Sequence, residues 1–384
     1  MNFIKKHKKL FAVLLVLALI WGGAFIWTLT IMPNRYEGEP LPAAAEGEVR
    51  YVKEEGATPY LAKYGADGEM LEVPFKLITV SDSHLLDESG DIFFEKLAIL
   101  LDQTKPDLVV LLGDLILSGK QDVQNKLAAF FEEREQYWGF VIGNHDGQEY
   151  TGTEDRYEQH RWWYGTMIGS PYCISFDEGG DEVYGFGNCA VNIRTPKGIS
   201  QTLFFTDNSL DSMSGATFDD SLVEWYEKRV NEIKEENGGK TVPSIVFMHR
   251  PITEYITAWE NLENGVTENT ELVYGDIIEE IECGTECNIY EKAKELGSTH
   301  TFICGHEHNN DTRIIYNGIN LIYTQGLHFE TYGRSTALKW KTIYAINMGC
   351  NWFTEGGTGF VISPDGECTI APEYIPLDYF FYTR

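Results

Sequence analysis

Positive charge is scarce in this sequence of 384 residues. The chain carries 30 Lys and Arg residues against 59 Asp and Glu residues, which gives a formal net charge of −29. A surface this acidic repels the phosphate backbone of nucleic acids, so we expect no nucleic-acid partner. The excess of carboxylates indicates a solvated outer face.

Cysteine is also scarce, and its spacing argues against one kind of site. Among seven cysteines, only Cys283 and Cys287 stand close together, in the stretch ECGTEC. A zinc knuckle needs a second close pair, so these two residues predict a small disulfide loop instead. Cys304 lies in an apolar run, which predicts a buried thiol. Further candidate pairs, whose connectivity the spacing leaves open, are Cys173 with Cys189 and Cys350 with Cys368.

The N-terminus departs from the acidic pattern. Residues 1–9 are basic, and residues 10–32 are apolar and uncharged. As a helix this run would measure roughly 34 Å, enough to cross a bilayer, and the lysines before it predict a cytoplasmic tail. We therefore expect a single-pass signal-anchor in the cell membrane. The alternative is a cleaved signal peptide, whose apolar region is usually shorter. In both cases the rest of the chain is predicted to be extracytoplasmic.

The remainder divides into a linker and one domain. Residues 33–72 show no firm periodicity and predict a stalk, followed by a domain over residues 73–384. Internal repeats and low-complexity tracts are absent. Apolar strands such as FKLITV alternate with amphipathic helices, a pattern typical of βαβ units with both sheet faces covered. YCISF, AVNIRT and TLFFTD predict further strands. We expect an α/β fold, a four-layer α/β/β/α sandwich of two mixed sheets. Residues 257–276 predict a long loop that shapes substrate access or is a surface excursion.

Five predicted strands end in residues that bind metals. Sites in open α/β sheets form beyond the carboxyl ends of strands, so residues distant in sequence can meet there. Asp114 suits a bridge between two cations, because a carboxylate has two oxygens and a negative charge. Imidazole and carboxylate ligands together favour manganese, iron or zinc over calcium. The residues at the strand ends are Asp82 and His84, Asp114, Asn144 and His145, His249, and His306 and His308.

The motifs D-x-H, G-D, G-N-H-D, a lone histidine and G-H-x-H, in this order, resemble those of the calcineurin-like metallophosphoesterase superfamily. They cover residues 82–308. The stretches FFTDNS, WYEKRV and IVFMHRP are similar to the branch related to purple acid phosphatases. The resemblance implies the metallophosphoesterase fold and two bound metal ions. One departure is Leu117, which stands where purple acid phosphatases carry a tyrosine ligand, so we expect no tyrosinate-bound ferric ion.

The resemblance also implies residue roles. Attack by a hydroxide held between the metals would hydrolyse the ester. His145 would protonate the leaving oxygen or steady the phosphate, and Asp146 would orient the His145 imidazole by accepting its other N–H. The implied ligands are Asp82, His84 and His308 for the first metal, Asp114 as the bridge, and Asn144, His249 and His306 for the second.

The implied activity is hydrolysis of a phosphate ester, on a small molecule or a phosphoprotein, with phosphomonoesters favoured. The alternatives are a phosphodiesterase of the same fold and a surface-anchored protein that binds phosphorylated ligands without catalysis. Besides Asn144 and His145, the candidate substrate-binding residues are Arg250 and His328, the latter with a structural role as an equal alternative. His160 lies in an aromatic cluster that predicts core packing or a lid. The oligomeric state stays open.

Overall fold

The computed structural model describes residues 36–376, with the exception of residues 37, 87–89, 211–217, 285–286 and 328–354. The helices in this part of the chain are α3 (Gly90–Thr104), α4 (Gln121–Glu132), α5 (Arg156–Met167), α6 (Asp220–Glu236), α7 (Thr253–Glu263), α8 (Ile289–Leu296) and the short η2 (Gly180–Glu182). The strands are β1 (Glu48–Val52), β2 (Tyr60–Tyr64), β3 (Phe75–Val80), β4 (Leu108–Leu112), β5 (Trp138–Val141), β6 (Cys189–Thr195), β7 (Gly198–Phe205), β8 (Ser244–Phe247), β9 (Thr270–Asp276), β10 (Thr299–Cys304), β11 (Asp311–Tyr316), β12 (Ile319–Tyr323), β13 (Gly356–Ile362) and β14 (Cys368–Tyr374).

These strands form two mixed sheets. One has nine strands in the order β1-β2-β6-β7-β8-β10-β12-β11-β9, and the other has five in the order β14-β13-β3-β4-β5. Each sheet contains a run of parallel strands: β3, β4 and β5 in the smaller sheet, and β7, β8, β10 and β12 in the larger one. Parallel neighbours place their carboxyl ends at one edge, which is the condition for a shared site.

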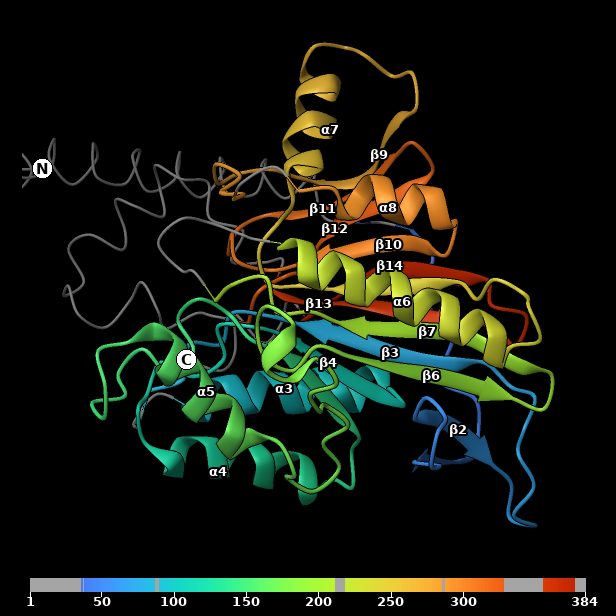
Figure 1. Ribbon diagram of the computed structural model, residues 1–384, viewed down its shortest axis with the longest axis horizontal. Coiled ribbons are helices and arrows are strands. Elements are labelled where there is room, and N and C mark those ends of the chain that lie inside the picture. Colours follow the sequence, from blue (N-terminus) through green and yellow to red (C-terminus); the bar gives the residue numbers. More distant parts are fainter. Residues whose placement is uncertain are drawn as a thin grey trace, which may run out of the picture.

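The apolar side chains separate into three main clusters that define four layers. The middle cluster joins the sheets, with Leu77 and Leu112 of the smaller sheet packed with Phe247 and Ile303 of the larger one. A second cluster fills the space between the smaller sheet and α3, α4 and α5, and a third lies between the larger sheet and α6, α7 and α8. Figure 1 shows α4 and α5 at the bottom, below the strands, and α8 toward the top. The two-sheet α/β fold predicted from the sequence is thereby confirmed.

The uninterrupted apolar sequence of the central strands follows from this layering. Every residue of β4, LVVLL, is buried, because the strand has a sheet neighbour on each side and a packed layer on each face. Helix α4 buries Val123, Leu127, Phe130 and Phe131 on one stripe and exposes its charged side chains. The helical spacing of apolar residues in α4 and the continuous apolar run of β4 therefore predict that each element packs in a layer.

The predicted stalk is wrong over part of its length. Within residues 33–72, β1 pairs with β2, and β2 pairs with β6 through Tyr60 and Leu61, so the larger sheet begins well before residue 73. The segment YLAKY is too short to display a period, yet Leu61 is completely buried. Residues 33–35 lie outside the described part of the chain.

Two further predictions of local structure need correction. YCISF forms no strand and makes a single bridge, from Cys173 to Trp138, beyond the edge strand β5. Residues 257–276, expected as a long loop, are instead the end of α7, a short connection and β9, which pairs with β11. A short stretch of sequence does not reveal β9, because the segment is a strand only through its pairing with β11.

The cysteine and membrane predictions have different outcomes. Cys173, Cys189, Cys283 and Cys287 are free thiols, so the two disulfides predicted among them are not formed, and Cys304 is a buried thiol as expected. The pairing of Cys368 with Cys350 is a prediction that involves a residue outside the described ones. Among the residues that the structure describes, no helix is long and apolar enough to cross a membrane, and the predicted span at residues 10–32 lies outside them.

Candidate metal centre

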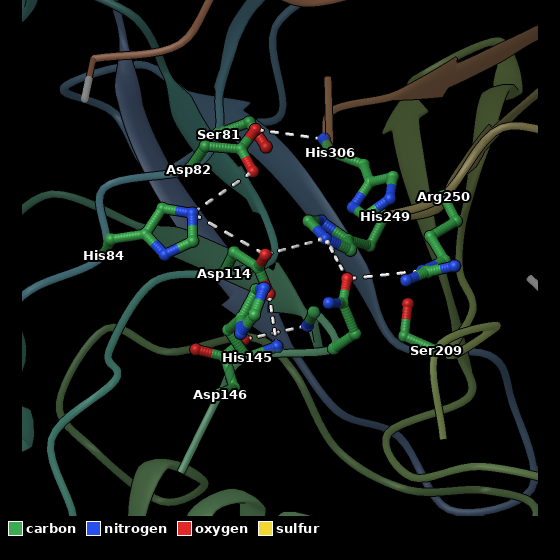
Figure 2. Close-up of polar contacts among 12 residues, drawn as sticks. Ser81, Asp82, His84, Asp114, His145, Asp146, Ser209, His249, Arg250 and His306 are labelled. Carbon is green, nitrogen blue, oxygen red and sulfur yellow. Dashed lines mark hydrogen bonds and ion pairs between the residues drawn. The ribbon is translucent and has the colours of Figure 1, made fainter. Parts of the chain in front are cut away.

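The loops that follow the parallel strands of both sheets meet at one edge. Asp82 follows β3, Asp114 follows β4 and Asn144 follows β5, while His249 follows β8 and His306 follows β10. A hydrogen bond joins the two sheets here, because the backbone N–H of His306 donates to Asp82 Oδ2 at 3.1 Å. Figure 2 shows the side chains of Asp82, His84, Asp114 and His249 turned toward one another.

The first cluster of ligand atoms comes from Asp82, His84 and His308, all buried. His84 Nε2 lies 3.0 Å from His308 Nε2, and Asp82 Oδ1 lies 3.4 Å from His308 Nε2 and 3.8 Å from His84 Nε2. Two ligand atoms bound at about 2.1 Å to one cation lie about 3.0 Å apart at a right angle and about 3.4 Å apart at a tetrahedral angle. Two of the three distances match these values, and the third, 3.8 Å between Asp82 Oδ1 and His84 Nε2, corresponds to a wider angle at one ion.

The second cluster joins Asp114, His249 and His306. His249 Nε2 lies 3.2 Å from Asp114 Oδ2 and 3.1 Å from Asn144 Oδ1, which brings the predicted amide ligand into the same group. His249 Nδ1 lies 2.7 Å from the carbonyl oxygen of Leu112. Nδ1 must donate to that carbonyl, so Nε2 is the ring atom that faces the cluster and can bind a metal once it has lost its proton.

Asp114 connects the two clusters. Its Oδ1 accepts a hydrogen bond from the backbone N–H of His145 at 2.7 Å, which fixes the plane of the carboxylate. Its Oδ2 then faces His249 Nε2 at 3.2 Å and His84 Nε2 at 3.6 Å, one nitrogen from each cluster. One oxygen is therefore placed to bridge two cations, which is the role that the sequence predicts for this residue.

The chemistry of the buried oxygens fits bound cations. Asp82 and Asp114 are each only 1% exposed, and within the described part of the chain Asp82 Oδ1 and Asp114 Oδ2 accept no hydrogen bond. Burying ionised oxygens without partners is costly, and a coordinated cation is one of the few arrangements that removes the cost. The oxygens in question are the ones that face the histidine nitrogens. The residues present therefore fit two metal ions.

The pKa shifts agree with this interpretation. Burial lowers the pKa of His84 to about 4 and that of His306 to about 3, so both rings are neutral and free to bind a cation at neutral pH. For His249 burial opposes the charged form, but the Asp114 carboxylate outweighs it and raises the pKa to about 9. Without metal, the protonated His249 ring balances part of the negative charge of Asp114, and metal binding would displace that proton.

The backbone of the metal centre is strained. Four predicted ligands adopt positive φ, a conformation that is uncommon for residues other than glycine, and strain of this kind concentrates at functional sites. The turns allow each side chain to reverse toward the centre directly after its strand. These ligands and their φ angles are Asp82 (58°), His84 (45°), Asp114 (49°) and His306 (76°).

The glycines of the motifs are required because the loops touch. A Cβ atom on Gly113 would lie 2.5 Å from His249 Nδ1, and one on Gly143 would lie 2.1 Å from the backbone nitrogen of Asp114. Real Cβ atoms do not approach heavy atoms this closely. Glycine at these positions therefore allows the G-D loop to lie directly against the G-N-H-D loop and His249.

His145 lies at the edge of the first cluster and is held by a partner other than the predicted Asp146. Its ring lies 5.5 Å from the ring of His84, beside the first cluster, and the residue is partly exposed. Its Nδ1 contacts Gln148 Oε1 at 2.5 Å, so Gln148 orients the ring. The sequence analysis missed this residue, although three residues across a turn is a spacing that permits the contact.

The role predicted for Asp146 is corrected by its hydrogen bonds. Asp146 is completely buried, and its Oδ1 accepts from the backbone N–H groups of Leu115 and Ile116, each at 2.8 Å. Its Oδ2 accepts from the N–H of Gly143 at 2.8 Å. The carboxylate therefore joins the loops that carry Asp114 and Asn144 and does not serve the imidazole of His145. A short carboxylate side chain after a tight turn lies nearer to backbone N–H groups than to the neighbouring imidazole, so it accepts from the backbone.

Arg250 borders the second cluster. It is 6% exposed, and its Nε donates to Asn144 Oδ1 at 3.3 Å. Asn208, which the sequence analysis did not single out, holds the adjoining loop, because its Oδ1 accepts from the backbone N–H groups of both His249 and Arg250 at 3.3 Å. Figure 2 shows Arg250 and Ser209 on the opposite side of the centre from His84. The other candidate substrate residue, His328, lies outside the described residues.

Comparison with known proteins adds independent support. The family model described as calcineurin-like phosphoesterase matches residues 75–310. "Probable inactive purple acid phosphatase 14" of Arabidopsis thaliana is 26% identical over 259 residues, and the match covers 60% of each chain. "Probable inactive purple acid phosphatase 29" of the same plant is 23% identical over 278 residues, covering 66% of this chain and 67% of that protein. The chain thus matches about three fifths of the length of the first relative.

Two solved structures resemble this chain at low sequence identity. A dimetal phosphatase from Danio rerio superposes with a TM-score of 0.43 at 14% identity, covering 78% of this chain and 99% of that one. GAP50, the anchor in the inner membrane complex of Plasmodium, superposes with a TM-score of 0.40 at 12% identity, covering 79% of this chain and 90% of that one.

Proposed function

Because the chain belongs to the calcineurin-like phosphoesterase family, we propose that it is a metal-dependent phosphoesterase that hydrolyses phosphate esters, with phosphomonoesters favoured. One observation carries the proposal: Asp114 Oδ2 faces nitrogens of both ligand clusters, at 3.2 and 3.6 Å. A purely structural role offers no reason to gather two carboxylates and four histidines at a buried edge with oxygens left uncompensated.

The residues around the clusters divide the remaining work. Two cations bound here would neutralise charge on the phosphate and lower the pKa of a water molecule enough to supply a nucleophile at neutral pH. His145, partly exposed and oriented by Gln148, lies where it can hand a proton to the leaving oxygen. The guanidinium of Arg250, on the opposite side, can bind a phosphate oxygen and fix the direction of attack.

Two alternatives remain in the same framework. A phosphodiesterase would use the same clusters, and a protein that only binds phosphorylated ligands would keep the metals without turnover. The second is favoured by the names of the two plant relatives, both called probable inactive. Against it stands the complete set of seven predicted ligands in this chain. Manganese, iron and zinc all suit these ligands, and Leu117 stands against a tyrosinate-bound ferric ion.

The location of the activity is part of the proposal. The apolar run at residues 10–32 supports a single-pass membrane anchor, with the phosphoesterase domain outside the cytoplasm. The substrate would then be an extracytoplasmic small molecule or phosphoprotein. Protease treatment of cells tests this orientation. The domain should be degraded although the cell membrane stays intact.

Metal removal tests the proposed function. The full chain, purified in a mild detergent and treated with a chelator, should lose at least 99% of its activity toward p-nitrophenyl phosphate, on the order of 10²-fold or more. Manganese, iron or zinc should restore it with two ions bound per chain, as measured by elemental analysis. Bis-(p-nitrophenyl) phosphate, a diester, should be hydrolysed more slowly. Equal rates before and after chelation would exclude the mechanism, and two bound ions without hydrolysis of any phosphate ester would favour the binding protein.

Substitution of His145 tests the proton donor. His145→Gln should lower kcat by about 10²-fold for an alkyl phosphate and by less for p-nitrophenyl phosphate, because nitrophenolate leaves without needing a proton. Both metals should stay bound, since the ring of His145 belongs to neither cluster. His300→Gln is the matched control, because His300 contacts Gln201 away from the centre. An equal loss for the two substrates would assign His145 to phosphate binding instead.

A further inference from the structure

The loop that carries Asn144, His145 and Asp146 is held on its outer side by one arginine. Arg156 is the first residue of α5, and its Nη2 donates to the carbonyl oxygens of Asn144 at 2.6 Å and Asp146 at 3.2 Å. These two carbonyls flank His145 in the chain. One guanidinium therefore binds the carbonyl oxygens of the residues immediately before and after His145.

Arg156 is itself oriented by the next turn of α5. Its Nη1 donates to Gln159 Oε1, and its Nη2 also lies 2.8 Å from His160 Nε2, so the two hydrogens of Nη2 are shared among three acceptors. Arginine can only donate, so His160 must accept, which requires a neutral ring with its proton on Nδ1. His160 is completely buried, and burial together with the charge of Arg156 lowers its pKa to about 3. The aromatic stretch EQHRWWYG thus supplies a hydrogen-bond acceptor for Arg156, in addition to packing.

Gln159 extends this network to the next segment. Its Nε2 donates to the carbonyl oxygens of Tyr150 at 3.2 Å and Thr153 at 3.0 Å, which belong to the connection between the G-N-H-D loop and α5. The helix start, the connection and the loop are therefore joined through two neighbouring side chains, Arg156 and Gln159. Rotation of the guanidinium away from the loop would break several hydrogen bonds together.

The loop is thus held from two directions. On the inner side, Asp146 accepts from Leu115, Ile116 and Gly143 and ties the loop to the neighbouring strand end. On the outer side, Arg156 binds the carbonyl oxygens. Asn144 Oδ1 must stay near His249 Nε2, now at 3.1 Å, to serve as a ligand. A shift of about 1 Å in such a group is enough to cost about 10²-fold in rate.

We propose that Arg156 is a positioning residue for the metal centre: with Gln159 and His160 as its supports, it holds the loop so that Asn144 reaches the second cluster and His145 faces the substrate. The expected effect of Arg156 on catalysis rests on the proposed function. Its expected effect on metal affinity can be measured whether or not the protein hydrolyses a phosphate ester. Partners outside the ligand shell of this kind typically change metal affinity or activity by about 10–100-fold.

The test compares three variants of the full chain. Arg156→Gln removes the charge and the double contact. Arg156→Lys keeps the charge but has one nitrogen where arginine has two, so it cannot bind the carbonyl oxygens and Gln159 through separate nitrogens. Arg161→Gln is the matched control. Arg161 lies on the same helix, is 60% exposed at its side chain and pairs only loosely with Glu158 at 3.8 Å. Calorimetric titration with Mn²⁺ alone measures both sites, and steady-state kinetics with p-nitrophenyl phosphate measures kcat and KM separately.

In Arg156→Gln we expect one of the two Mn²⁺ affinities to fall by about 10–100-fold and kcat to fall by at least about 10-fold, with KM changed less than about threefold. Arg156→Lys should recover part of both losses, and Arg161→Gln should match the parent chain.

If Arg156→Gln does not fold, the Arg156→Lys titration decides, since an unchanged pair of affinities in that folded variant would overturn the proposal. Lower thermal stability of Arg156→Gln with both affinities and kcat unchanged would also overturn it. If the parent chain binds Mn²⁺ but hydrolyses nothing, the proposed function fails while the affinity result still stands.

Discussion

Replacing Asp114 by asparagine should lower kcat toward p-nitrophenyl phosphate by about 10³-fold, equivalent to about 4 kcal/mol, and reduce the bound metal to at most one ion per chain. In the parent chain Oδ1 accepts from the N–H of His145 while Oδ2 faces both clusters. In asparagine only one of these atoms is an oxygen. The His145 N–H needs an acceptor, so the amide NH₂ would turn toward the metals and repel them.

The measurement pairs elemental analysis with steady-state kinetics on the full chain. Asp365→Asn makes the same chemical change in the turn between β13 and β14, where the side chain is 72% exposed, and it should leave both quantities unchanged. A variant at position 114 that kept two metals and a kcat within about threefold of the parent chain would remove Asp114 from the bridge. The proposed function would then lose the observation that carries it.

Gly143→Ala should destabilise the protein by about 3 kcal/mol and abolish the second metal site, because the added methyl group has no room. Its Cβ would lie 2.1 Å from the backbone nitrogen of Asp114 and 2.2 Å from its Oδ1. Neither atom can move away alone, since the nitrogen is backbone and the carboxylate is held by His145. The two loops must separate, and Asn144 moves with them.

Urea unfolding followed by tryptophan fluorescence measures the loss of stability, and Mn²⁺ titration measures the loss of the site. Gly165→Ala is the control: Gly165 lies inside α5, and an added methyl group there would have no neighbouring atom within 4 Å. Alanine favours the helix, so this variant should be equally stable or up to about 1 kcal/mol more stable. Parent-like stability and metal binding in Gly143→Ala would show that the loops tolerate separation.

The sequence predicted more of the metal centre than of the chain around it. The predicted ligands Asp82, Asp114 and His249 could be singled out because each follows an apolar run at a strand end, a signal contained within a few residues. By contrast, β1 and β2 were predicted as part of a stalk, since short strands show no clear period and only their neighbours in the sheet define them.

The supporting contacts were the least predictable part. Asp146 was assigned to the imidazole of His145, but the backbone N–H groups of Leu115 and Ile116, 31 and 30 residues away in sequence, bind its carboxylate instead. Asn208 supports His249 across a separation of 41 residues. Such partners depend on which loops are in contact, and residue types alone do not predict those contacts.

The amino-acid sequence by itself determined the layers of the fold and the kinds of donor at each strand end, because burial of apolar runs and the chemistry of carboxylate, amide and imidazole are local properties. The family resemblance already implied how those donors divide between two metals, with Asp114 as the bridge. Only the tertiary structure decided that a single oxygen of Asp114 faces both clusters and that Gln148, Asn208 and Arg156 hold the surrounding loops. The reason is steric: these contacts arise where loops from two sheets approach within a few ångströms, and that approach is set by the packing of the whole domain.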